Sequence, residues 1–152
     1  MIDGKSISNS PDETFELGAE LGAELRGGEV ILLTGGLGAG KTLLTKGILS
    51  SLEFDVDEVT SPSFTLVNLY KTETFNVYHI DLWRSDSNDP AFSVGLEEIL
   101  EDDKGIVIIE WAEKLANFIF GSVVYRIDMA GDGDEPRQIM LRRTEKTPGT
   151  SV

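Results

Sequence analysis

The sequence predicts an α/β fold of three layers, in which helices flank a mixed, mostly parallel sheet. Two continuous apolar runs, at residues 30–33 and 106–109, are typical of strands that are buried on both faces. Segments with helical spacing come before and after each run, as expected for a sheet with helices on its faces. Residues 1–152 correspond to a single domain, which is long enough to bury a substantial core.

The first helix has a clear start and a clear end in the sequence. Residues 1–9 before it are expected to be flexible. Ser10 has the position of an N-cap, Pro11 that of the first helical residue, and Glu13 completes the capping pattern. The glycine pair at 27–28 ends the helix.

The rest of the chain alternates between strand-like and helix-like segments. The segment 91–103 is either one helix or two short helices, with an interruption near Gly95. The tail at 144–152 is expected to be flexible. The expected elements are, in order, a strand at 30–33, a helix over 41–52, a hairpin of 64–70 with 75–82, the segment 91–103, a strand at 106–109, a helix over 112–120 and a hairpin of 123–129 with 138–142.

The charge of the chain limits its partners. Thirteen basic and 27 acidic residues give a net charge of −14. Such a surface repels phosphate backbones, so no direct tight binding to nucleic acid is expected, whereas a basic protein partner would suit it. The alternative is that the acidity only keeps a small domain soluble.

Composition excludes several kinds of site. The sequence has no cysteine, which excludes disulfides, thiolate nucleophiles and cysteine-based metal centres, and its single histidine excludes a histidine-rich metal site. Its apolar runs are far shorter than the ~18 residues needed to cross a bilayer. The chain shows no secretory signal pattern either, so we expect a cytoplasmic protein with no membrane contact.

Residues 35–42 fit the phosphate-binding loop (P-loop) pattern Gly-x-x-x-x-Gly-Lys-Thr. Its glycines let successive backbone N–H groups point at phosphate oxygens, and the N-terminus of the next helix adds a positive dipole. Lys41 would reach the β- and γ-phosphates, and the Thr42 hydroxyl would bind Mg²⁺. The apolar strand before the loop and the helix after it are the context that this motif requires. The predicted nucleotide contacts in the loop are Gly36, Leu37, Gly38, Ala39, Gly40, Lys41 and Thr42.

Two carboxylates that follow predicted strands are candidates for a magnesium nucleotide site. Glu110 follows the apolar run at 106–109 and is the first candidate for the magnesium side, because the strand beside the P-loop strand often ends in such an acid. Asp81 would bind the water shell of the metal or orient the attacking water. The alternative for each is a strand-end acid that is exposed to solvent.

Other polar and aromatic residues have two interpretations each. The hydroxyls of segment 60–65 would reach the γ-phosphate or the metal, as in nucleotide-sensing loops, or the segment is only a loop that enters a strand. We interpret His79 as structural, because it alternates with its neighbours in a strand. Trp83 and Trp111 would line a nucleotide or partner surface, or pack at the rim of the core.

Two related functions are disfavoured by what the sequence lacks. It contains no guanine-recognition signature of the Asn/Thr-Lys-x-Asp type, which argues against a conventional GTPase. It leaves little room for a substrate lid or an acceptor-binding domain, which argues against a small-molecule kinase.

Five segments match one family together and in the same order. They are Gly-Leu-Gly-Ala-Gly-Lys-Thr at 36–42, Ser-Pro-Ser-Phe-Thr-Leu-Val at 61–67, Tyr-His-Ile-Asp-Leu-Trp-Arg at 78–84, Gly-Leu-Glu-Glu at 95–98 and Ile-Glu-Trp at 109–111. On these segments the chain resembles the TsaE (YjeE) family, small bacterial P-loop ATPases of the tRNA threonylcarbamoyladenosine pathway. The P-loop alone would not identify the family, but the ordered set is highly specific.

The resemblance implies a compact P-loop fold, ATP and Mg²⁺ as cofactors, and a role in modifying the adenosine beside the anticodon. In that family TsaD carries out the transfer and is held by TsaB, and TsaE docks on this pair. By position, Lys41, Asp81 and Glu110 match the catalytic residues of the family. Thr42 and Glu110 match its magnesium side. The stretch that includes Thr14 resembles the part of the family that lies near the adenine.

Two residues depart from the family pattern, and the function implied has an alternative. Gly36 stands where the family usually has Asp, and Trp83 where it usually has Tyr. The resemblance implies a Mg²⁺-dependent ATPase. We expect it to be slow in isolation, because the sequence offers no convincing internal arginine finger. The alternative is a nucleotide-gated assembly factor, in which ATP binding rather than hydrolysis matters.

Overall fold

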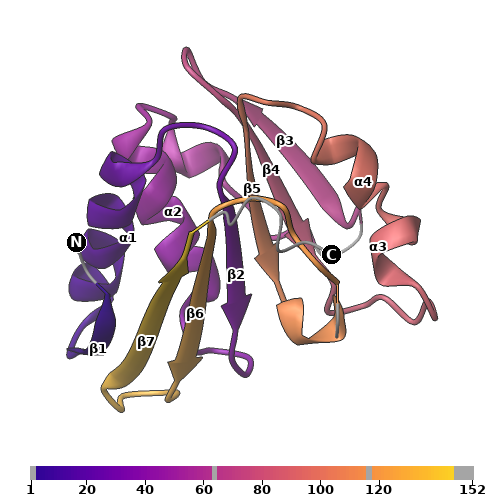
Figure 1. Cartoon of the computed structure of the whole chain (residues 1–152). Coiled ribbons are helices and arrows are strands. Elements are labelled where there is room, and N and C mark those ends of the chain that lie inside the picture. The colour runs from indigo at the N-terminus through magenta and orange to yellow at the C-terminus, as the bar shows by residue number, and fades with distance from the viewer. Residues whose placement is uncertain (1–2, 63–64, 116–117, 146–152) are drawn as a thin grey trace.

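The computed structural model describes residues 3–62, 65–115 and 118–145, and in them the strands form one mixed sheet (Figure 1). The strands are β1 (Gly4–Ser8), β2 (Val30–Thr34), β3 (Val67–Lys71), β4 (Asn76–Asp81), β5 (Gly105–Glu110), β6 (Val124–Ala130) and β7 (Arg137–Thr144). The α-helices are α1 (Pro11–Glu24), α2 (Lys41–Ser51), α3 (Pro90–Ser93) and α4 (Leu96–Ile99). Two 3₁₀ helices are η1 (Val56–Glu58) and η2 (Ala112–Leu115).

The centre of the sheet is parallel and its flanks are antiparallel. The strand order is β1-β7-β6-β2-β5-β4-β3. The four central strands, β6, β2, β5 and β4, run parallel, whereas β1, β7 and β3 pair antiparallel with their neighbours. The predicted mixed sheet with a parallel centre is therefore confirmed. The parallel register places the carboxyl ends of β2, β5 and β4 side by side.

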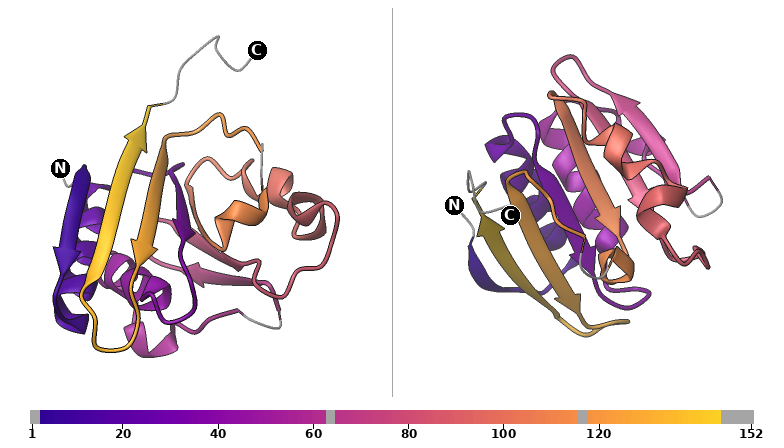
Figure 2. Two further views of the ribbon diagram at one scale, coloured as in Figure 1. Left: turned by 90° about the horizontal axis from the view of Figure 1, so that it is seen from below. Right: turned by 45° about the vertical axis from the view of Figure 1, so that its right-hand side comes forward.

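Helices cover both faces of the sheet, so the three predicted layers are present (Figure 2). On one face α1 and α2 bury Ile31, Leu33 and Ile108 in one apolar cluster. On the other face α3, α4 and η2 pack over a second cluster that contains Leu32 and Ile109. The alternation along each central strand explains why the predicted runs are apolar throughout.

The start of α1 is as predicted. The Ser10 hydroxyl accepts a hydrogen bond from the N–H of Glu13 at 3.2 Å, and the Glu13 carboxylate accepts one from the N–H of Asn9 at 2.9 Å. Pro11 occupies the first helical turn. These bonds satisfy N–H groups that the helix itself leaves without acceptors.

The expectation that residues 1–9 are flexible is wrong for the strand that they contain. Gly4–Ser8 forms β1, which pairs along its whole length with β7. Its sequence, Gly-Lys-Ser-Ile-Ser, has little strand character of its own, and Ile7 points into solvent. The edge of β7 provides the hydrogen-bond partners, so this strand depends on a segment at the other end of the chain.

One further predicted segment agrees with the structure, and three others differ from it or extend beyond its described part. Segment 91–103 contains two short helices, α3 and α4, separated at Gly95, which was one of the two alternatives. The helix predicted over 112–120 is only the 3₁₀ helix η2, and residues 116–117 lie outside the described part. The hairpin strand predicted from residue 64 begins at Val67. Of the predicted flexible tail, residue 144 ends β7, and 146–152 lie outside the described residues.

None of the helices in the described part of the chain is both long and apolar enough to span a membrane.

Candidate nucleotide-binding site

The P-loop connects the carboxyl end of β2 to the first turn of α2. Gly40 is the N-cap of α2 and has a φ of 104°, a left-handed conformation that favours glycine. Because this residue has no side chain, it cannot cap the helix in the usual way. The first N–H groups of α2 are thus available to an external acceptor, and phosphate oxygens are the acceptors that such a terminus binds.

Lys41, the first residue of α2, is buried and lies across the P-loop. Its Nζ donates hydrogen bonds to the carbonyl oxygens of Gly35 at 2.6 Å and Gly36 at 2.8 Å. The same atom lies 4.4 Å from the centre of the Trp111 ring. Burial lowers the pKa of Lys41 below its ordinary value, while the negative charge of Glu110 opposes this shift. The ammonium group is therefore held between the carbonyl oxygens of the P-loop and the Trp111 ring.

The two predicted carboxylates lie side by side. Asp81 ends β4 and Glu110 ends β5, and these residues are direct partners in the parallel register. Both are almost fully buried, with 4% and 3% of their surface exposed. The alternative of a solvent-exposed strand-end acid is therefore wrong for both residues. Oε2 of Glu110 lies 3.5 Å from the Thr42 hydroxyl, which joins the carboxylate to the first turn of α2.

Asp81 is held by the segment that follows the P-loop helix. The Ser61 hydroxyl donates to Oδ2 of Asp81 at 2.8 Å, and the N–H of Trp83 donates to Oδ1 at 2.9 Å. Segment 60–62 thus contacts the site through Asp81. The sequence analysis did not predict this contact between a hydroxyl and a carboxylate. Residues 63–64 of the predicted segment 60–65 lie outside the described part of the chain.

His79 also contacts the site. It was interpreted as structural, but its Nε2 lies 2.5 Å from Oε2 of Glu110. The signal that could have found it is its spacing, because residues two apart in a strand point to the same face, and Asp81 is two residues further on. The rings of Trp83 and Trp111, for which the sequence left two interpretations, pack against each other with centres 4.5 Å apart and planes tilted by 31°.

A cavity of about 250 Å³ lies beside the P-loop, between the start of α1 and the turn after β6. Thr14, Gly40 and Arg137 are among its lining residues. The Thr14 hydroxyl is buried and shares a 2.7 Å hydrogen bond with that of Ser8. Arg137 Nη2 donates to the P-loop carbonyl of Gly38 at 3.0 Å. Sequence analysis missed Arg137, because no motif marks the C-terminal hairpin.

The residues present fit both ATP and Mg²⁺. The P-loop N–H groups and Lys41 suit a chain of phosphates, and the adjoining cavity offers room beside them. The Thr42 hydroxyl and the Glu110 carboxylate are oxygen donors of the type that Mg²⁺ prefers. Among the described residues no group of three His, Cys, Asp or Glu could hold a metal ion by itself.

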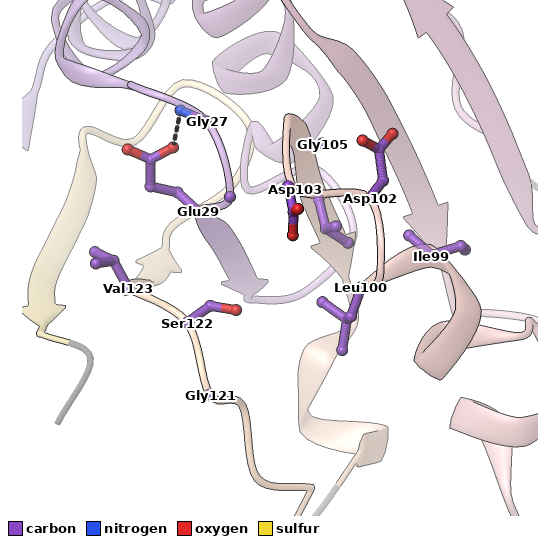
Figure 3. Close-up of a pocket in the computed structure, with 12 residues that line it drawn as sticks. Gly27, Glu29, Ile99, Leu100, Asp102, Asp103, Gly105, Gly121, Ser122 and Val123 are labelled. Carbon is purple, nitrogen blue, oxygen red and sulfur yellow. Dashed lines mark hydrogen bonds between the residues drawn. The ribbon is translucent and has the colours of Figure 1, made fainter. Parts of the chain in front are cut away.

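A separate cavity of about 340 Å³ lies at the opposite end of the central strands (Figure 3). Its walls come from the turn before β2, the start of β5 and the segment before β6. There the carboxylate of Glu29 accepts hydrogen bonds from the N–H groups of Arg26 and Gly27, both at 2.8 Å, and so fixes the turn. Ligands of open α/β sheets bind outside the carboxyl ends of the strands, which favours the P-loop end as the functional site.

Comparison with known proteins identifies the family. The family model described as Threonylcarbamoyl adenosine biosynthesis protein TsaE matches residues 8–139. The chain belongs to the TsaE family. The matched range contains the P-loop, Thr14, Asp81 and Glu110, and it also contains Arg137. The resemblance seen in the sequence motifs is therefore confirmed.

Individual relatives agree with the family model. A tRNA threonylcarbamoyladenosine biosynthesis protein TsaE from Rickettsia bellii is 34% identical over 119 residues, which are 78% of this chain and 81% of that protein. The protein of the same name from Nostoc sp. is 42% identical over 107 residues, which are 68% of this chain and 65% of that protein. The crystal structure of YdiB from Bacillus subtilis is similar with a TM-score of 0.71 and 28% identity, over 94% of this chain and 85% of that one.

Proposed function

We propose that this chain is a Mg²⁺-dependent ATPase that acts on the TsaB–TsaD complex in tRNA threonylcarbamoyladenosine biosynthesis. Membership of the TsaE family supports the pathway. The observation that carries the ATPase proposal is one arrangement: a P-loop lysine and threonine face two buried carboxylates from adjacent strand ends. This is the set of groups that phosphoryl transfer to water requires.

Each residue of the site has a distinct role in this proposal. The P-loop N–H groups would bind phosphate oxygens, and Lys41 would turn from the carbonyls of Gly35 and Gly36 toward them. Thr42 and, through water, Glu110 would hold Mg²⁺, which when bound would neutralise phosphate charge. Asp81 would orient the water that attacks the γ-phosphate.

The proposed partners follow from the family and agree with the charge. A surface with a net charge of −14 does not favour tRNA, so the isolated chain is expected to bind free tRNA only weakly. Contact with the modification machinery would instead be made through the TsaB and TsaD proteins. Tight, salt-sensitive binding of tRNA by the isolated chain would contradict this part of the proposal.

ATP turnover with Mg²⁺ tests the proposal, measured for the chain alone and with TsaB, TsaD and tRNA. We expect slow turnover alone and faster turnover with the complex. Lys41→Ala should abolish nucleotide binding or hydrolysis, because it removes the phosphate-facing charge. Lys46→Ala is the matched control, since it removes the same charge from the same helix outside the site. Unchanged turnover in Lys41→Ala would remove the P-loop from the mechanism.

Glu110→Gln distinguishes hydrolysis from a nucleotide gate. The variant keeps the shape of the side chain but loses its charge, so it should bind ATP and hydrolyse it much more slowly. If tRNA modification falls with hydrolysis, the ATPase is required. If full modification persists while hydrolysis is lost, ATP binding alone acts as the switch.

A further inference from the structure

We propose that His79 is a positioning residue, which holds the Glu110 carboxylate and ties it, through Tyr70, to the backbone of Thr60. The proposal rests on the proposed function, because Glu110 is placed there on the magnesium side. It gives the only histidine of the sequence a role in coupling the nucleotide site to segment 60–62.

The contacts of His79 form a continuous chain. Its ring is fully buried in β4, with Nε2 2.5 Å from Oε2 of Glu110 and Nδ1 3.4 Å from the Tyr70 hydroxyl. That hydroxyl lies 3.0 Å from the carbonyl oxygen of Thr60 and accepts a hydrogen bond from the Thr60 N–H at 3.2 Å. Three side chains therefore connect the end of β5 to the backbone of segment 60–62.

The donors and acceptors in this chain set the tautomer of the ring. A carboxylate can only accept hydrogen bonds, so the contact with Oε2 of Glu110 assigns a proton to Nε2. Nδ1 faces the hydroxyl of Tyr70, which also lies 3.0 Å from the Thr60 carbonyl oxygen. Carboxylates that bind a metal are commonly held by a hydrogen bond from a partner that does not itself touch the metal, which is the place of His79 here.

A purely structural histidine would not need this arrangement. A buried carboxylate is costly unless it is hydrogen-bonded, and His79 supplies the shortest bond that Glu110 makes in the described part of the structure. The bond from Thr42 Oγ1 is longer, at 3.5 Å, so it holds the carboxylate less firmly than His79 does. His79 is thus the group that sets where Oε2 points.

Segment 60–62 is connected to both carboxylates of the site. Ser61 donates to Asp81, and the Thr60 backbone is joined to Glu110 through Tyr70 and His79. A change in the position of Asp81 would therefore be transmitted to Ser61, and a change in the position of Glu110 to Thr60, the residue before it in the same segment.

NMR of the ¹⁵N-labelled protein tests the tautomer directly, because one histidine gives one pair of ring signals. We expect a proton on Nε2, the ring nitrogen that faces Glu110. Tyr70→Phe should shift the Nδ1 signal and speed hydrogen exchange at the Thr60 amide. Tyr78→Phe is the matched control, because its hydroxyl bonds Asp102 instead and should alter neither reading. A ring without a proton on Nε2, or equal effects of the two Tyr variants, would overturn the proposal.

Titration of Mg²⁺ at saturating ATP tests the positioning role. His79→Ala should raise the Mg²⁺ concentration for half-maximal turnover by about 10–100-fold, the usual effect of losing an outer partner of a metal-binding group. Binding of ATP in the presence of a chelator should stay unchanged, since His79 does not touch the P-loop. His79→Gln, whose amide nitrogen can donate where Nε2 does, should recover part of the loss.

The outcomes separate this proposal from the proposed function. A folded His79→Gln or His79→Ala protein with an unchanged Mg²⁺ requirement would overturn the positioning role. Equal loss of ATP binding with and without Mg²⁺ would also overturn it, since that indicates a structural role alone. Failure of the proposed function would instead appear in the wild-type protein, as absent ATP binding with the expected ring spectrum intact.

Discussion

The same substitution at two neighbouring P-loop residues should have opposite outcomes. Gly35 has a φ of 138°, and a Cβ added there would lie 2.4 Å from the carbonyl oxygen of Met129 in β6. Gly36 lies outside the left-handed region, and a Cβ added there would meet nothing within 4 Å. Gly35→Ala should therefore displace the P-loop from β6, whereas Gly36→Ala should leave it in place.

The magnitude follows from two separate costs at Gly35. A left-handed conformation costs an L-residue about 1–2 kcal/mol. A methyl group forced against a backbone oxygen adds about 1–3 kcal/mol, because backbone atoms must shift. The free energy of unfolding should thus fall by about 3 kcal/mol in Gly35→Ala. In Gly36→Ala it should change by less than about 0.5 kcal/mol, or rise slightly because the unfolded chain loses freedom.

Urea unfolding followed by circular dichroism provides the measurement. With an m-value of about 2 kcal/mol/M, the midpoint of Gly35→Ala should fall by about 1.5 M, while that of Gly36→Ala should stay near the wild type. ATP affinity should follow the same order, because only Gly35→Ala moves the N–H groups of the loop. Equal midpoints for the two variants would refute the reasoning from backbone conformation and contact.

Three further outcomes are expected. Gly47→Ala should destabilise the protein by about 2 kcal/mol in thermal unfolding, because the added Cβ would lie 2.1 Å from a backbone oxygen of α1. This cost should exceed the gain from alanine's higher helix propensity. A higher melting temperature would contradict the prediction. Hydrogen bonds from Asn76 and Tyr78 lower the pKa of Asp102, so Tyr78→Phe should lower the free energy of unfolding by about 1 kcal/mol at pH 7. This loss should shrink as the pH falls below 3.8 and through the lowered pKa of Asp102. A loss that is constant with pH would exclude the hydrogen bond as its cause. The pKa of Lys41 is lowered, so ATP affinity should decline as the pH rises through this lowered pKa, below 10.5. Lys41→Arg should abolish the decline, because arginine keeps its charge. The same decline in both proteins would assign it to another group.

The central elements could be predicted because their sequences reflect burial on both faces. The runs at 30–33 and 106–109 are apolar at every position, since alternate residues enter different cores. The edge strand β1 could not be predicted in this way. Its pattern is polar, and it exists because β7, more than 100 residues further along the chain, offers an unpaired edge.

The residues of the candidate site also differ in how far the sequence predicts their positions. Lys41 and Thr42 belong to a local motif, so their place in the structure follows from their place in the sequence. The contacts of His79 and Arg137 depend on strand register and on a distant hairpin, neither of which a local pattern records. Asp81 and Glu110 lie between these cases: each was visible as an acid after a strand, but their direct pairing is a property of the sheet.

The pairing of these two acids argues for separate roles. Two buried carboxyl groups at adjacent strand ends each require their own hydrogen-bond partners, because a buried polar group without a partner is costly. Asp81 accepts hydrogen bonds from Ser61 and the backbone N–H of Trp83, whereas Glu110 lies against Nε2 of His79 and accepts a long bond from Thr42 on the P-loop helix. Because the donors differ, neither acid can replace the other when it is substituted. Acids whose environments differ in this way commonly divide the work of a site, and only Glu110 is joined to the residue that would bind the metal.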